Sequence, residues 1–154
     1  LVRVINMDGE SYYIDDRSKL MPLHKYTARV LVATGFINEP YATCYQVPVN
    51  DFAKNEAFSK TSVLDDIYAV SSYIAKDSVQ TSLILQINVN ADKDLELYPS
   101  IGEHVIVFGE ATDIEEKFRK LKLFYTEGLN KTDGWNKYSI INIKYKNQVV
   151  CTKK

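Results

Sequence analysis

Apolar and polar residues alternate along most of the short segments of this chain, a period of two that predicts β-strands with one buried face. The alternation is longest at 83–90, where Leu83, Leu85, Ile87 and Val89 share one side. Shorter strands are predicted at 2–6, 12–14, 29–33, 95–99, 104–108 and 138–145.

Apolar residues spaced three to four apart predict two helices. Thr61 or Ser62 opens the first helix. Its apolar face comprises Val63, Ile67, Val70 and Ile74. The second follows Asp113, which is predicted to cap it in a capping-box-like pair with Glu116. Its apolar positions are Ile114, Phe118, Leu121, Tyr125 and Leu129.

These elements follow one another in the order strands, helix, three strands, helix, strand. Short turn signals, such as Asp8-Gly9 and the NADKD run at 90–94, make antiparallel hairpins the simplest connections. The sequence therefore predicts an α+β domain, with a mainly antiparallel sheet and two main helices packed on it.

The overall composition adds few constraints. Of the 154 residues, 45% are hydrophobic and 25% are charged, with a formal net charge of −1. The chain can therefore bury a core, and it carries no strong field that would attract nucleic acid. It contains no run of about 18 apolar residues that would predict a membrane span. Because it opens directly on a strand-like run, without an initiator Met or a signal-peptide pattern, we expect it to be a piece of a longer protein.

Residues that could carry catalysis or bind metal are few. Cys44 and Cys151 form no CxxC motif, and His24 and His104 lie far from them in the sequence, so no metal site or cofactor is predicted. The two cysteines are either buried free thiols or a disulfide, which needs an oxidising compartment. A hydrolase that pairs Cys44 with a histidine is a further alternative, but no glycine elbow flanks Cys44.

The sequence favours a binding module over an enzyme, mostly because no catalytic constellation is found in it. Lys117, Arg119, Lys120 and Lys122 stand among acidic residues on the second predicted helix and are interpreted as a solvated face. The chain also has 11 tyrosines. Their rings suit half-buried sheet faces and protein interfaces, and Tyr145 lies near the end of the last predicted strand.

Much of the chain carries a family resemblance. The stretch INVNADKDLELYPSIGEHVIVFGEATDIEEKFRKLKLFY, followed by GWNKYSIINIKYKNQVV, resembles the membrane-distal β domain of the bacterial cell-division protein FtsQ, called DivIB in Gram-positive bacteria. The opening VRVINMDGESYYIDDRSKLMPL resembles the first hairpin of that family. The segments YTARVLVATG and NQVVCTKK resemble the sequences of the Bacteroidetes branch of this family. Residues 38–60 match poorly, whereas 83–150 carry the most specific similarity.

The resemblance implies that residues 1–154 form one FtsQ-type β domain, preceded by a transmembrane helix and a POTRA domain. Such a protein sits on the periplasmic face of the inner membrane at the division site. It is a non-enzymatic divisome scaffold that binds FtsB- and FtsL-like proteins during septum formation, by strand addition at its C-terminal edge. The family's basic-aromatic pair corresponds to Lys144 and Tyr145, with Asn147 and Gln148 just after.

Physical chemistry agrees with this implied mode of binding. An uncovered sheet edge presents unpaired N–H and C=O groups that a peptide completes as a further strand. Lys144 and Lys146 on such an edge discourage self-association and admit an acidic partner. Two alternatives stay open. The segment 138–150 is fully paired or folds back as a hairpin at Lys146-Asn147, or the domain belongs to a different envelope scaffold.

Overall fold

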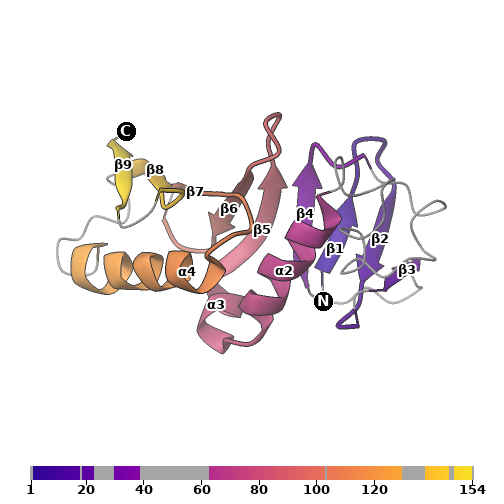
Figure 1. The fold of residues 1–154 in the computed structure, drawn as a ribbon, viewed down its shortest axis with the longest axis horizontal. Helices are drawn as coiled ribbons and strands as arrows, with labels where there is room; N and C mark the ends of the chain where they lie inside the picture. The colour runs from indigo at the N-terminus through magenta and orange to yellow at the C-terminus, as the bar shows by residue number, and fades with distance from the viewer. Residues whose placement is uncertain are drawn as a thin grey trace.

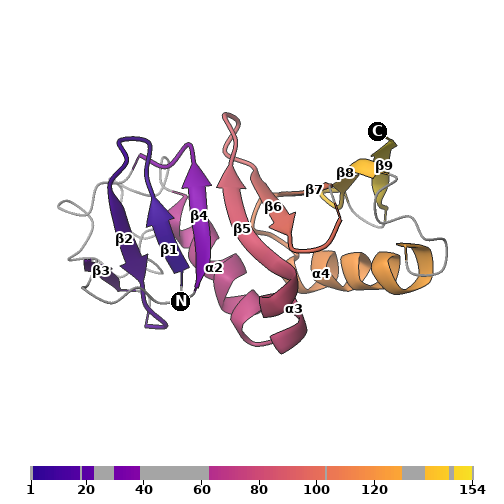
Figure 2. The same cartoon turned by 180° about the vertical axis from the view of Figure 1, so that it is seen from behind.

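The computed structural model of this protein describes residues 2–17, 19–22, 30–38, 63–102, 104–129, 138–145 and 148–153. These residues form an α+β fold, in which one sheet runs along the molecule and the helices pack against it (Figures 1 and 2). The predicted fold class is therefore confirmed.

Nine strands of the described part form one sheet in the order β3-β2-β1-β4-β5-β6-β7-β8-β9 (Figure 1). The strands are β1 Val2–Ile5, β2 Ser11–Ile14, β3 Leu20–Pro22, β4 Leu31–Gly35, β5 Ile84–Val89, β6 Leu95–Pro99, β7 Val105–Gly109, β8 Tyr138–Asn142 and β9 Val150–Lys153. Two of these, β3 and β9, lie outside the predicted strand ranges, and they are the two ends of the sheet.

The sheet is mixed, which corrects the prediction of a mainly antiparallel one. The pairs β1/β4, β4/β5 and β7/β8 are parallel. Two parallel strands that follow one another along the chain need a long crossover connection, which usually contains a helix. Helices do occur between β4 and β5 and between β7 and β8. Turn signals within the sequence indicate only the hairpins, so they could not reveal these crossovers.

The structure describes three α-helices, rather than the two predicted. They are α2 Leu64–Ala75, α3 Ser78–Leu83 and α4 Ile114–Leu123, and α4 continues into the π-helical segment η2 Phe124–Leu129. Thr61 and Ser62, predicted to open the first helix, lie outside the described residues. The predicted apolar stripes are buried in the core at Ile67, Val70, Ile74, Phe118, Leu121 and Tyr125.

Two of the helix starts differ from the prediction. Asp113 precedes α4 with a left-handed φ of +50°, and its side chain makes no cap hydrogen bond, so the predicted capping box with Glu116 is wrong. The short helix α3, which the sequence pattern did not indicate, has an ordinary cap. The Asp77 carboxylate accepts a hydrogen bond from the Val79 N–H at 2.8 Å.

The longest alternating segment contains a break that a period of two does not predict. β5 begins at Ile84, and its register with β6 shifts between Ile84 and Gln86. A β-bulge of this kind changes which face the neighbouring side chains occupy. Ile87 and Val89 are buried, but Leu85 is 54% exposed and does not share their side.

Gly35 ends β4 at a point where the backbone comes very close to β5. Its φ is +103°, and a Cβ atom at this position would overlap the Val89 carbonyl oxygen and lie 2.7 Å from Asn88 Oδ1. The Val89 carbonyl cannot move freely, because it accepts a hydrogen bond from the Phe36 N–H at 2.9 Å. A side chain at position 35 would therefore push two central strands apart.

Replacing Gly35 by alanine should lower the free energy of unfolding by about 2–4 kcal/mol, because backbone strain and steric overlap add. Gly9→Ala is the matched control. Gly9 also has a positive φ, +83°, but nothing lies within 4 Å of an added Cβ. It should cost only the conformational strain, about 1 kcal/mol. Denaturant titration measures both values, and equal losses would contradict the close approach at Gly35.

Asp66 lies in the first turn of α2 and is the carboxyl group with the largest described pKa change. Burial, followed by the charges of Asp65 and Glu110, raises the pKa of Asp66 to about 6. An aspartate in an unfolded chain titrates near about 3.9. Between these two values the folded state binds more protons than the unfolded state. The contribution of the Asp66 carboxyl group to stability is thus fully present below the pKa of the unfolded state. It is lost as the pH rises through the pKa of the folded state.

Asp66→Asn should therefore stabilise the protein at neutral pH, by about 1–2 kcal/mol after discounting for solvent screening of a half-exposed carboxylate. The gain should shrink as the pH falls and approach zero below about pH 3, where the parent carboxyl group is protonated in both the folded and the unfolded state. Urea unfolding between these limits measures the difference. Asp92→Asn removes the same charge from an exposed position in the β5–β6 loop and should change little. A gain from Asp66→Asn that is the same at both ends of the range would contradict the burial argument.

Candidate functional site

The C-terminal segment that resembles a docking edge is paired on both sides. β8 lies between β7, to which it is parallel, and β9, to which it is antiparallel. It ends at Asn142, three residues before the predicted end at Tyr145. The alternative in which the chain folds back as a hairpin is confirmed. The strand at the end of the described sheet is therefore β9, rather than the segment 138–145.

The backbone of β9 has an inner and an outer side, and the register assigns them. The Ile143 N–H donates to the Val107 carbonyl on the β7 side. Backbone groups alternate along a strand, so those of Ile140 and Asn142 face β9. Their register partners are Thr152 and Val150, whose groups face back toward β8.

The same alternation places the backbone groups of Cys151 and Lys153 on the outer side of β9, where no described strand follows. The outer edge thus offers two residues with N–H and C=O groups available to a further strand. This edge could not be found from periodicity, because the four residues of β9 do not alternate in hydrophobicity.

Lys144, predicted to steer a partner, follows β8 and is held by an internal ion pair. Its Nζ atom lies 2.6 Å from Asp94 Oδ2 in the β5–β6 loop. The hydrogen bond and the charge of Asp94 raise the pKa of Lys144, so this lysine stays cationic. Its stem crosses Gly109, where an added Cβ would lie 2.7 Å from Lys144 Cγ. Lys144 therefore ties the end of β8 to the β5–β6 hairpin.

Tyr145 and Gln148, the other predicted contact residues that the structure describes, both expose their side chains. Tyr145 is 49% exposed, and Gln148 lies at the side of a groove beside β9. Asn147, predicted to accompany them, lies outside the described residues. The side chains of Tyr145 and Gln148 are thus available for contact. Their backbone carbonyls, in contrast, accept hydrogen bonds from a side chain of α4.

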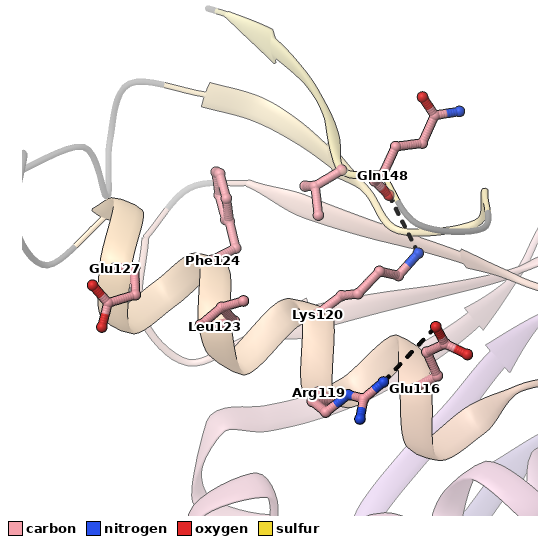
Figure 3. A pocket seen from close by; sticks show the side chains of 8 residues that line it. Glu116, Arg119, Lys120, Leu123, Phe124, Glu127 and Gln148 are labelled. Atoms are coloured by element: carbon pink, nitrogen blue, oxygen red, sulfur yellow. Dashed lines mark hydrogen bonds and ion pairs between the residues drawn. The ribbon is translucent and has the colours of Figure 1, made fainter.

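Lys120 of α4 holds those carbonyls. Its ammonium group donates to the carbonyl oxygens of Ile143, at 3.1 Å, of Tyr145, and of Gln148, at 3.2 Å. Figure 3 shows the side chain reaching from the helix toward Gln148. One lysine thus joins the end of β8 to the start of β9.

Lys117, one turn earlier on α4, is also an internal residue. It is 5% exposed, its Nζ atom lies 4.7 Å from the centre of the Phe108 ring, and it donates to the Glu110 carbonyl at 2.7 Å. The interpretation of Lys117 and Lys120 as a solvated face is therefore wrong. A signal for Lys117 was present, because it stands three residues after Ile114 and so within the apolar stripe.

A groove lies between α4–η2 and the residues that lead into β9 (Figure 3). Its volume is about 810 Å³. Leu123, Phe124 and Val149 supply its apolar lining, and Arg119 and Glu127 are among its charged residues. Leu123 is 60% exposed, so this apolar surface is open to a partner.

The opposite face of the same hairpin is also partly apolar. Ile140 of β8 and Val150 of β9 are 36% and 45% exposed. Their register partners, Thr152 and Asn142, share that face, so the two apolar side chains lie diagonally across the hairpin. The outer edge of β9 is therefore flanked by apolar surface on both faces of the sheet.

The candidate cysteine and histidine chemistry finds no assembled site in the described part of the chain. Cys151 is half-buried, and burial raises the pKa of its thiol. His104 is 3% exposed, and its Nε2 atom lies 2.8 Å from Tyr125 Oη. Cys44 and His24 lie outside the described residues, so both the disulfide Cys44–Cys151 and the Cys–His hydrolase stay predictions.

Two further observations concern the described residues. No group of three His, Cys, Asp or Glu side chains among them could hold a metal ion. Likewise, none of their helices has the length and apolar character needed to cross a membrane.

Comparison with known proteins places the chain in a protein family. A family model described as FtsQ/DivIB, C-terminal related matches residues 1–152, which is almost the whole chain. No curated protein matches the chain.

Proposed function

This chain belongs to the FtsQ/DivIB, C-terminal related family, a family of cell-division scaffolds, and on that premise we propose that it is a partner-docking domain of the divisome. In this proposal residues 1–154 form one β domain on the periplasmic face of the inner membrane. A POTRA domain and a transmembrane helix precede it and anchor it at the division site. The domain is non-enzymatic and binds FtsB- and FtsL-like proteins during septum formation.

The docking surface in this proposal is the outer edge of β9. The observation that carries it is that β9 ends the described sheet with the backbone groups of Cys151 and Lys153 on its outer side. A partner segment in extended conformation would complete these groups as a tenth strand. Lys153 is exposed on this edge, and a charge at that position discourages pairing between two copies of the domain.

The surfaces on either side of β9 fit an added strand. Successive side chains of a strand point to opposite faces of the sheet. One set from the partner would meet the groove beside Phe124 and Val149, and the other would meet Ile140 and Val150 on the open face. Apolar partner side chains on both faces would supply most of the affinity, and the edge hydrogen bonds would fix the register.

The predicted contact residues flank this edge. Tyr145 offers an exposed aromatic ring of the type that anchors protein interfaces. Gln148 lines the groove, and Lys144 remains charged although it is paired with Asp94. We propose Tyr145 as the anchor, Lys144 as a peripheral charge that attracts an acidic partner, and Asn147 and Gln148 as neighbouring contacts.

Cys151→Pro tests the edge directly. Proline has no N–H and is tolerated on an edge strand where that group faces solvent, so the free domain should keep its melting temperature. A partner strand cannot bond to position 151, so affinity for an FtsB-like peptide should fall by about 1–3 kcal/mol, roughly fivefold to 150-fold. Isothermal titration calorimetry measures the affinity.

Two matched variants complete that test. Cys151→Val keeps the N–H and should bind like the parent chain. Thr152→Pro removes an N–H that faces β8, so it should lower the melting temperature. Unchanged affinity in a folded Cys151→Pro domain would contradict docking at the β9 edge.

Tyr145→Ala should weaken binding of the same peptide by about 1–3 kcal/mol, because an aromatic anchor of the interface is lost. Its effect on the melting temperature should be small, since the ring is half exposed. Phe36→Ala is the matched control, because Phe36 is 42% exposed and follows β4, four strands from β8. Equal affinities of the Tyr145→Ala and parent domains would remove Tyr145 from the interface.

A further inference from the structure

We propose that Lys120 is a positioning residue, which holds Tyr145 and the start of β9 in the arrangement that the partner recognises. This inference rests on the proposed docking function and adds a residue that the family comparison does not mark. Lys120 acts here through the backbone of the docking segment, in addition to lining the groove.

The ammonium group of Lys120 has three N–H donors, and three backbone carbonyls accept from it. They belong to Ile143, Tyr145 and Gln148. Bonds from a charged donor are stronger than those between neutral groups. Lys120 thus uses its full donor capacity on one short segment, which is more than a solvated surface lysine needs.

The three carbonyls lie where the chain leaves the sheet. The Ile143 N–H makes the last bond toward β7, and the Lys144 N–H then bonds to Asn142 Oδ1 at 2.9 Å, which turns the chain. Ladder pairing resumes only with Val150 and Asn142. Lys120 therefore bonds to the segment just after β8 ends, within the turn, and just before β9 begins.

Ile143 is buried in the core, but the described side chains that follow it in the segment do less to hold the backbone in place. Tyr145 and Gln148 are exposed, and Lys144 is tied at its tip to Asp94 while its stem crosses Gly109. Val149 is the first residue after the turn that packs against the core. Backbone bonds from Lys120 are thus what fixes Tyr145 relative to the groove and to the outer edge at Cys151.

Loss of the ammonium group should therefore loosen the docking surface without opening the core. Lys120→Met keeps the length and the helix propensity of the side chain. In the partner-free 154-residue chain, amide hydrogen exchange of Val150 and Thr152, whose N–H groups face β8, should become about tenfold faster, because losing the bonds from Lys120 weakens the start of the hairpin. Affinity for an FtsB-like peptide should fall by a similar factor.

Lys122→Met is the matched control, because Lys122 is an exposed lysine of the same helix and its replacement removes the same charge. It should change neither the exchange rates nor the affinity. The melting temperature of both variants should stay close to that of the parent, which separates positioning from a general loss of stability.

Chemical rescue distinguishes the hydrogen bonds from a mere effect of charge. In Lys120→Ala, added propylammonium can place an ammonium group among the three carbonyls and should slow exchange and restore part of the affinity. Tetramethylammonium has the same charge but no N–H donor, so it should restore neither.

The possible failures are distinguishable. Unchanged exchange in Lys120→Met, or faster exchange with unchanged affinity, would overturn the positioning role while the parent still binds its partner. If the parent chain itself fails to bind the FtsB-like peptide, the proposed function is overturned, and the docking role of Lys120 falls with it.

Discussion

Backbone carbonyls that leave a sheet must find donors elsewhere, and in this protein lysine side chains supply them at several strand ends. Lys93 donates to the Phe36 carbonyl beyond β4, and Lys117 donates to the Glu110 carbonyl beyond β7. Lys120 serves three carbonyls between β8 and β9. These bonds join the loops that follow the C-terminal ends of β4, β7 and β8 to neighbouring elements. They allow β8 and β9 to form a short hairpin there without a long ladder of their own.

That constraint decides which part of the C-terminal segment can bind a partner. Strand β8 has neighbours on both sides, so the free edge of the described sheet lies on the four residues of β9. Lys144 is engaged with Asp94, and Lys120 fixes the backbone beside Tyr145. The docking surface that we propose therefore consists of a short edge, an apolar groove on one face and two exposed apolar residues on the other. A preformed site of this kind lowers the entropic cost of binding a partner.

The sequence was informative where local periodicity and burial coincide. The stripes through Ile67 and Phe118 predicted both long helices, because apolar positions at helical spacing have to face a core. It was silent on the parallel pairs, which depend on contacts across long crossovers, and on the bulge after Ile84, which a strict period of two hides. The interpretation of Lys117 as solvated missed its position within the apolar stripe, whereas no sequence pattern indicates the backbone carbonyls to which Lys120 donates. The family resemblance predicted a C-terminal region and its residues for testing, and the register then identified β9 as the outer edge of the described sheet.

The central claim is that a partner adds as a strand to the outer side of β9. Amide hydrogen exchange, read residue by residue with and without an FtsB-like peptide, tests it most directly. The account predicts that binding protects the amides of Cys151 and Lys153, whereas those of Val150 and Thr152, which already face β8, change little. Protection that appears at the other end of the sheet, on β3, with Cys151 and Lys153 unaffected, would contradict it.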